Sequence, residues 1–133
     1  MAKDRGINGV WFGPNGNIDN SNAEEAFLRE VSLFRTSAKN VNFKNAYMLD
    51  AILRQGNFDG ADFSGANMAN ACVREMSAVG AIFRGTDLSG VSFTDVNVEG
   101  ADFRGANMDH TSFEGANVKN TLGLPRAIYN KFA

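Results

Sequence analysis

The sequence is poor in the side chains that perform most metal and covalent chemistry. It holds one cysteine, Cys72, and one histidine, His110, among 133 residues. A lone cysteine cannot form an intramolecular disulfide, and no second His or Cys is present to complete a zinc ligand set or a nucleophile–base pair. We therefore expect no metal, no cofactor and no catalytic residue.

Long apolar stretches are missing as well. No segment approaches the roughly 18 consecutive apolar residues that indicate a membrane-spanning helix. The opening residues, MAKDRGINGV, also lack the apolar core of a signal peptide. We expect a soluble protein without a membrane-inserted segment.

Neither sign of charge is in large excess. The chain has 13 Lys and Arg residues against 15 Asp and Glu residues, which gives a formal net charge of −2. Proteins that bind nucleic acids usually carry a basic stripe or patch, and this balance does not provide one. We therefore expect no nucleic-acid partner.

What the sequence does contain is internal repetition. Residues 61–70 read ADFSGANMAN, and residues 101–110 read ADFRGANMDH. Steps of five in the phase of Phe63 give sixteen positions between residues 43 and 118, and all sixteen are apolar. At an apolar content of 44%, chance produces such a run with a probability on the order of 10⁻⁶. The repeat therefore has to be explained before any single residue.

Each repeat has the same internal order. A small residue stands two places before the large apolar one, as Ala61 does before Phe63, and Gly or Asn often stands two places after it. Apolar residues two apart point to one side of an extended backbone. Gly and Asn tolerate the positive φ that a tight turn can require. The five-residue unit is therefore a short strand followed by a corner.

The units A-D-F-S-G, A-N-M-A-N and A-D-F-R-G resemble pentapeptide repeats. The resemblance implies an all-β fold, a right-handed four-sided parallel β-helix (solenoid) in which four units make one coil. A four-unit coil requires like residues every 20 positions, and Phe43, Phe63, Phe83 and Phe103 satisfy this requirement. We expect about five coils over residues 16–120.

The segments outside the repeats are expected to protect the ends of the rod, because bare strand edges invite pairing with other molecules. We assign residues 1–15 to an N-terminal segment that packs on or caps the first coils, with Trp11 and Phe12 as its apolar anchors. Residues 121–133 are predicted to form a C-terminal cap with a short helix, since Ile128 and Phe132 would give that helix one apolar side. We expect a monomer or a weak homodimer through a coil end.

Two places in the repeat depart from the usual order of sizes. Met76 and Ala78 reverse the small and large positions, so Met76 can fill the volume that a large central residue would occupy. Ala38 has no such partner beside Thr36. We expect a looser or locally irregular coil at Ala38.

Several large apolar residues fall in outward places of the first coils, where polar residues are expected. They form the candidate partner-binding patch, called the first-coil patch below: Phe27, Phe34, Tyr47, Leu49 and Ile52. Together they would expose more apolar surface than scattered single residues do. Two interpretations remain open. The segment GINGVWFGPNG can fold back over this patch or over the open end of the first coil, or the patch can bind a partner.

The sequence favours a non-enzymatic function. The repeat uses nearly every interior side chain for packing and leaves no concave site for His110 or for acid pairs such as Asp62 and Asp102. We expect a scaffold or regulatory protein that binds a protein partner. The resemblance implies an alternative, a DNA mimic that inhibits or protects a topoisomerase such as gyrase, although mimicry needs dense negative charge along the rod. The resemblance implies a setting in a cyanobacterium or plastid. We therefore expect a cytoplasmic protein, or one of the thylakoid lumen or plastid if the chain is a processed form.

Overall fold

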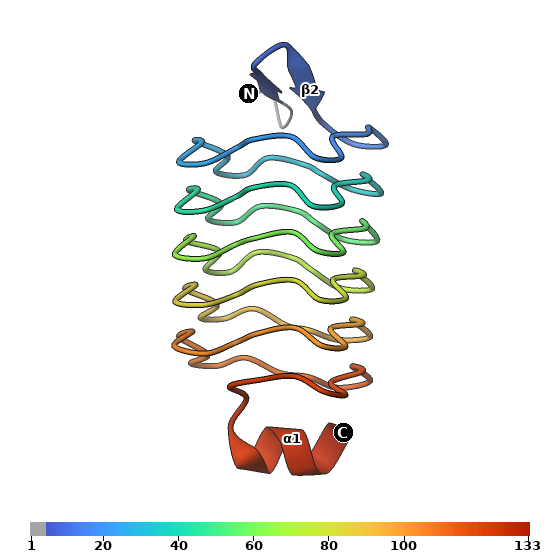
Figure 1. Ribbon diagram of the computed structural model, residues 1–133, viewed down its shortest axis with the longest axis vertical. Helices are drawn as coiled ribbons and strands as arrows, with labels where there is room; N and C mark the ends of the chain where they lie inside the picture. Colours follow the sequence, from blue (N-terminus) through green and yellow to red (C-terminus); the bar gives the residue numbers. More distant parts are fainter. Residues whose placement is uncertain (1–4) are drawn as a thin grey trace.

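The molecule is a rod of stacked coils with a different structure at each end (Figure 1). The computed structural model describes residues 5–133. Parallel bridges join each outward residue to the residue 20 positions later, from Asn17↔Ser37 at one end to Asp102↔Leu122 at the other. Four five-residue units therefore make one coil, and the predicted right-handed, four-sided parallel β-helix is confirmed.

The hydrogen bonds of the backbone run along the rod. Phe43 N donates to Asp62 O at 2.8 Å, and Asp62 N donates to Val41 O at 3.0 Å, so each coil both donates to the next coil and accepts from it. These bonds satisfy the polar groups of the strands, which is what allows so narrow a rod to have a dry interior.

The corners are tight turns with a residue of positive φ. Ala46 N donates to Phe43 O at 3.0 Å across a turn in which Asn45 has a φ of 56°. A positive φ at the third residue is the property of a type II turn, and it favours Gly or Asn. The sequence signal of Gly or Asn in the fifth place of the unit is thereby explained.

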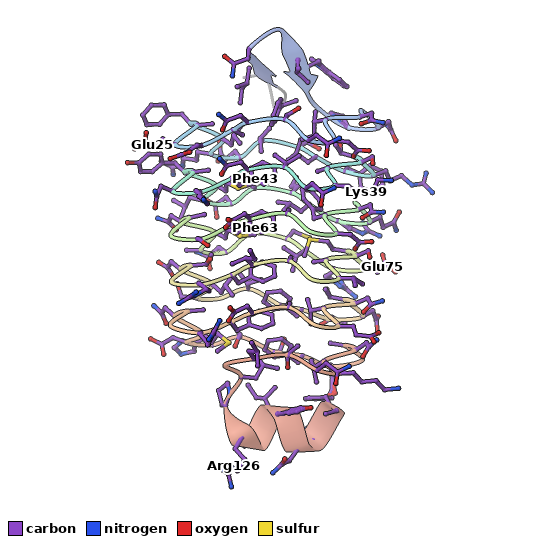
Figure 2. The ribbon with its side chains drawn as sticks, in the orientation of Figure 1. Glu25, Lys39, Phe43, Phe63, Glu75 and Arg126 are labelled. Atoms are coloured by element: carbon purple, nitrogen blue, oxygen red, sulfur yellow. The ribbon has the colours of Figure 1, made fainter. Side chains whose placement is uncertain are left out.

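The interior contains the predicted column of phenylalanine rings, two of which are labelled in Figure 2. Phe43, Phe63, Phe83 and Phe103 stack with centroid separations of 5.0, 5.1 and 4.9 Å and with ring planes within 6° of parallel. Every one of these side chains is fully buried. The predicted stack is confirmed.

The side of the rod that carries the unusual residue sizes is nevertheless regular. Ala38 N donates to Asn57 O at 2.7 Å within an unbroken ladder, and Ala38 is fully buried. Thr36 is also buried, and its hydroxyl donates to Gly13 O at 2.8 Å. The expected irregularity at Ala38 is therefore wrong, because the backbone ladder and the bonded threonine keep the coil in register.

The N-terminal end of the rod is covered by a short hairpin. Strand β1 (Arg5–Ile7) pairs antiparallel with β2 (Val10–Phe12), and the turn between them has positive φ at both Asn8 and Gly9. Such a turn is the type I′ turn that Asn-Gly favours in hairpins. Phe12 is fully buried in the core. The ring of Trp11 lies over Gly13, where an added Cβ would meet it at 2.2 Å.

The C-terminal end is covered by one short helix, α1 (Arg126–Phe132), as predicted. Pro125 precedes it, and Leu124, Ile128 and Phe132 are half-buried against the core. The chain reaches this helix through Gly123, which has a φ of 82° and lies so close to the preceding coil that a Cβ would be 2.5 Å from Arg104 N. The helix therefore follows a turn that only glycine fits.

Candidate protein-binding surface

The middle residue of each strand points outward, and it is often a polar residue whose side chain accepts a hydrogen bond from the backbone N–H two residues later. Asn57 Oδ1 accepts a hydrogen bond from Asp59 N at 3.0 Å, and Asn67 Oδ1 accepts one from Ala69 N at 3.1 Å. Asn, Asp and Ser side chains commonly stabilise turns in this way. An apolar residue in this place gives up that bond, so its presence there needs another explanation.

Phe27 and Tyr47 are the clearest exceptions to this pattern. They occupy the same outward column one coil apart, and their backbones form a bridge. Their rings stack at a centroid separation of 5.0 Å with an interplanar angle of 10°. Phe27 is nevertheless 78% exposed and Tyr47 51% exposed. We call these two residues the aromatic pair.

The other three residues of the first-coil patch are only half-buried and lie elsewhere around the coil. Leu49 and Ile52 flank the next corner, beside the turn residue Asp50. Phe34 lies beyond them at a further corner, with the guanidinium groups of Arg35 and Arg54 at 5.7 and 6.0 Å from its ring centroid. Phe34 therefore lies close to two cations and does not extend the apolar surface.

The described part of the N-terminal segment packs over the open end of the first coil and leaves the aromatic pair uncovered. Ile7 and Val10 pack against the core, whereas Phe27 keeps most of its surface exposed. The described part of this segment therefore covers the open end of the first coil and not the aromatic pair. Whether a partner binds the first-coil patch stays a prediction.

A depression that was not predicted from the sequence lies between the hairpin and the first coil. It has a volume of about 440 Å³. Its lining comes from the hairpin on one side and from the first coil on the other: Gly6, Ile7, Asn8, Asn22, Glu24, Ala26 and Phe27. The Asn8-Gly9 pair was a readable hairpin signal. Where the hairpin would dock was not readable, because that depends on packing between distant segments.

Several charges on the sides of the rod form ion pairs. Lys44 Nζ lies 3.8 Å from Asp62 Oδ2, and Arg84 and Arg104 both approach Asp102. The hydrogen bond from Arg104 holds the pKa of Asp102 below its usual value. Lys44, Arg84 and Arg104 occupy one column of the repeat, and each pairs with an adjacent acid, which weakens any field of one sign along that column.

The residues that could support other chemistry are scattered. His110 is exposed at a corner, and Cys72 is half-buried in the outward place of a unit almost two coils earlier. In the part of the chain that the structure describes, no three His, Cys, Asp or Glu side chains are grouped to hold a metal ion. Residues 5–133 also include no helix that is long and apolar enough to cross a membrane.

A second hollow, of about 300 Å³, lies between α1 and the last coil. Phe113 and Glu114 line it from the coil, and Ile128, Lys131 and Phe132 line it from the helix. Lys131 Nζ lies 3.8 Å from Glu114 Oε1, so an ion pair borders this hollow. Its lining belongs to the contact between the cap and the rod.

These features define a class of protein, a parallel β-helical solenoid built from five-residue units with a cap at each end. The family model for pentapeptide repeats matches residues 50–75 and 81–120 in eight copies. The chain belongs to the pentapeptide repeat family. No curated protein matches the sequence closely enough to count as a relative.

Solved structures agree with this fold. The chain is similar to the pentapeptide repeat protein Rfr23 from the cyanobacterium Cyanothece 51142, with a TM-score of 0.80, 20% identity, and coverage of 83% of this chain and 89% of that one. It is also similar to QnrB1, a plasmid-mediated fluoroquinolone resistance protein, with a TM-score of 0.51, 23% identity, and coverage of 80% and 64%. At these identities the likeness shows the fold alone.

Proposed function

We propose that this protein binds another protein through the aromatic pair and the adjoining Leu49 and Ile52, without catalysis and without a cofactor. The observation that carries the proposal is the stacked but exposed state of Phe27 and Tyr47. Aromatic side chains of this kind are enriched at the energetic centres of protein interfaces.

The rest of the same column supports the proposal. The residues below the aromatic pair are Asn67, Asp87 and Asn107, each of which accepts a hydrogen bond from a backbone N–H two residues later. The fold therefore accommodates a polar residue at this place, and only the first two coils of the column carry an aromatic residue there instead. Because the rings are already stacked on a rigid ladder, little side-chain entropy remains to be lost on binding.

The experiment is a pull-down from the native source with the intact chain and with a Phe27→Asn, Tyr47→Asn double variant. Asparagine occupies the same place two and four coils further along, at positions 67 and 107, so the variant should keep the fold. We expect the partner to be lost from the double variant. Circular dichroism and thermal melting check that the variant is folded.

Val79→Ser is the matched control for that experiment. Val79 is an exposed apolar residue on a different corner of the rod, so its removal should leave the partner bound. If the partner remains equally bound to the double variant, the proposal is wrong and the binding surface lies elsewhere.

The DNA-mimic alternative has weaker support. A plasmid-mediated resistance protein shares the fold, but the net charge of this chain is only −2, and Arg84 and Arg104 lie beside Asp102. A topoisomerase supercoiling assay tests this alternative. Inhibition or protection that disappears as salt is raised would favour it over our proposal, because charge-driven contacts between exposed groups are screened by salt.

A further inference from the structure

The ring of Phe27 has one occupied face and one open face. The ring of Tyr47, one coil further from the hairpin, stacks on one face of the Phe27 ring. The other direction leads to the depression between hairpin and first coil, which Phe27 helps to line. The aromatic ladder therefore ends in an open ring face with space beside it.

The polar side of this depression is acidic. Glu24 lines it and is exposed, and its Oε1 accepts a hydrogen bond from Asn42 Nδ2 at 3.2 Å. Among the described residues Glu24 has no ion pair, because the nearest base in its column, Lys44, pairs with Asp62 instead. No described residue that lines the depression is basic. The side chain of Glu25, in the adjoining turn, extends from the edge of the rod in Figure 2.

The hairpin adds backbone groups to the same site. In a two-residue hairpin the residues next to the turn, Ile7 and Val10, form a hydrogen-bonded pair. The N–H and C=O of Gly6 then point away from β2, and Gly6 lines the depression. Asn8 Nδ2 donates to Asn22 O at 3.5 Å, which ties the hairpin turn to the first coil. The free edge of β1 therefore offers a polar wall to an extended segment.

We propose that this depression binds the side chain of an arginine carried by an extended segment of the partner protein. The guanidinium would lie on the open face of Phe27 and pair with Glu24, while the segment passes the edge of β1. This inference rests on the proposed function, since it names the chemistry of the partner at the same surface.

Arginine fits better than lysine because its planar guanidinium can stack on a ring and still donate hydrogen bonds to a carboxylate. The chain itself contains this arrangement, since the guanidinium groups of Arg35 and Arg54 lie 5.7 and 6.0 Å from the Phe34 ring. Among the described residues that line the depression there are a ring and an acid but no cation.

The test is an NMR titration of the intact ¹⁵N-labelled protein at low salt with two capped tripeptides, Ala-Arg-Ala and its citrulline counterpart. Citrulline keeps the planar shape of arginine and lacks its charge. We expect the arginine peptide to bind about fivefold more tightly, as one cation–π contact and one exposed ion pair allow. Amide shifts should concentrate at Gly6, Glu24 and Phe27.

Two variants and one control decide the assignment. Glu24→Gln should reduce the preference for arginine about threefold and leave citrulline binding unchanged. Phe27→Leu, which keeps an apolar side chain without a ring, should weaken arginine binding by a similar factor. Glu99→Gln is the matched control, because Glu99 Oε1 accepts the same kind of bond from Asn117 Nδ2, at 3.3 Å, on another corner near the opposite end.

Equal binding of the two peptides would overturn the inference and indicate a neutral segment instead. Amide shift changes located away from the depression would also overturn it. So would self-association of the protein through the residues of the depression, detected as shifts that change with protein concentration. The outcome is separable from that of the proposed function. If arginine fails to bind but the Phe27→Asn, Tyr47→Asn variant still loses its partner, only the inference about arginine is wrong.

Discussion

Phe83 lies in the middle of the interior ring column, so its truncation tests whether neighbouring coils stabilise one another. Its ring centroid lies 5.1 Å from that of Phe63 and 4.9 Å from that of Phe103. Phe93 meets it edge-on at 5.9 Å. Phe83→Ala therefore removes a fully buried ring that has aromatic neighbours on three sides.

The expected cost follows from burial and from these ring contacts. Truncating a buried Phe to Ala lowers the free energy of unfolding by about 3–5 kcal/mol. Favourable ring pairs contribute about 0.5–1.5 kcal/mol each beyond burial, so Phe83→Ala should fall at the upper limit, about 5 kcal/mol. Phe113→Ala is the matched comparison, because Phe113 is buried in the last coil and contacts only Phe93 and Phe103 among the rings of the described residues. An end coil of a solenoid can open without the rest, so its cost should be lower by about 2 kcal/mol.

Urea unfolding followed by far-ultraviolet circular dichroism measures both values by linear extrapolation. Phe83→Leu serves as a control, since it keeps apolar volume and should cost less than Phe83→Ala. If Phe113→Ala destabilises the protein as much as Phe83→Ala does, or if Phe83→Ala costs less than about 2 kcal/mol, the reasoning from nearest-neighbour coils is wrong.

Three further predictions concern the corners, the cap and the charges. Glu25 has a φ of 59°, so Glu25→Gly should raise the free energy of unfolding by about 1 kcal/mol. Gly80 has a φ of 67° and open space around it, so Gly80→Ala should lower the free energy of unfolding by a similar amount through backbone strain alone. Urea midpoints equal to that of the unsubstituted protein would contradict this. Deletion of residues 122–133 exposes strand edges and should cause association in sedimentation experiments, and a monomeric, equally heat-stable product would count against the cap. The pKa of Asp102 is depressed from 3.8 by Arg104, so its contribution to stability is present above about pH 4 and is lost as the pH falls through its folded value. Asp102→Asn should therefore flatten the decline of the melting temperature in acid, and an unchanged acid limb would refute it.

The five-residue period is sufficient to predict the body of the rod. A coil of four five-residue units places every residue beside the residues 20 positions before and after it, so the order of letters already specifies the ladder. The stack of Phe43 and Phe63 and the pairing of Phe27 with Tyr47 follow from this arithmetic. The short helix after Pro125 was also predictable, because its apolar residues have helical spacing.

The ends of the rod and the fine packing of its surface depend on contacts between segments that the repeat does not relate. The hairpin at residues 5–12 is not part of the repeat, so no register fixes where it lies, and the depression beside Phe27 exists only because the hairpin packs on the coil end. The same limit explains Phe34. Its outward place could be predicted from the sequence, but its closeness to two guanidinium groups depends on side-chain conformations. Within the rod, each residue lies beside the residue 20 positions away, so its neighbours can be predicted. Outside the repeat no such relation exists, and the neighbours of a residue depend on how distant segments pack.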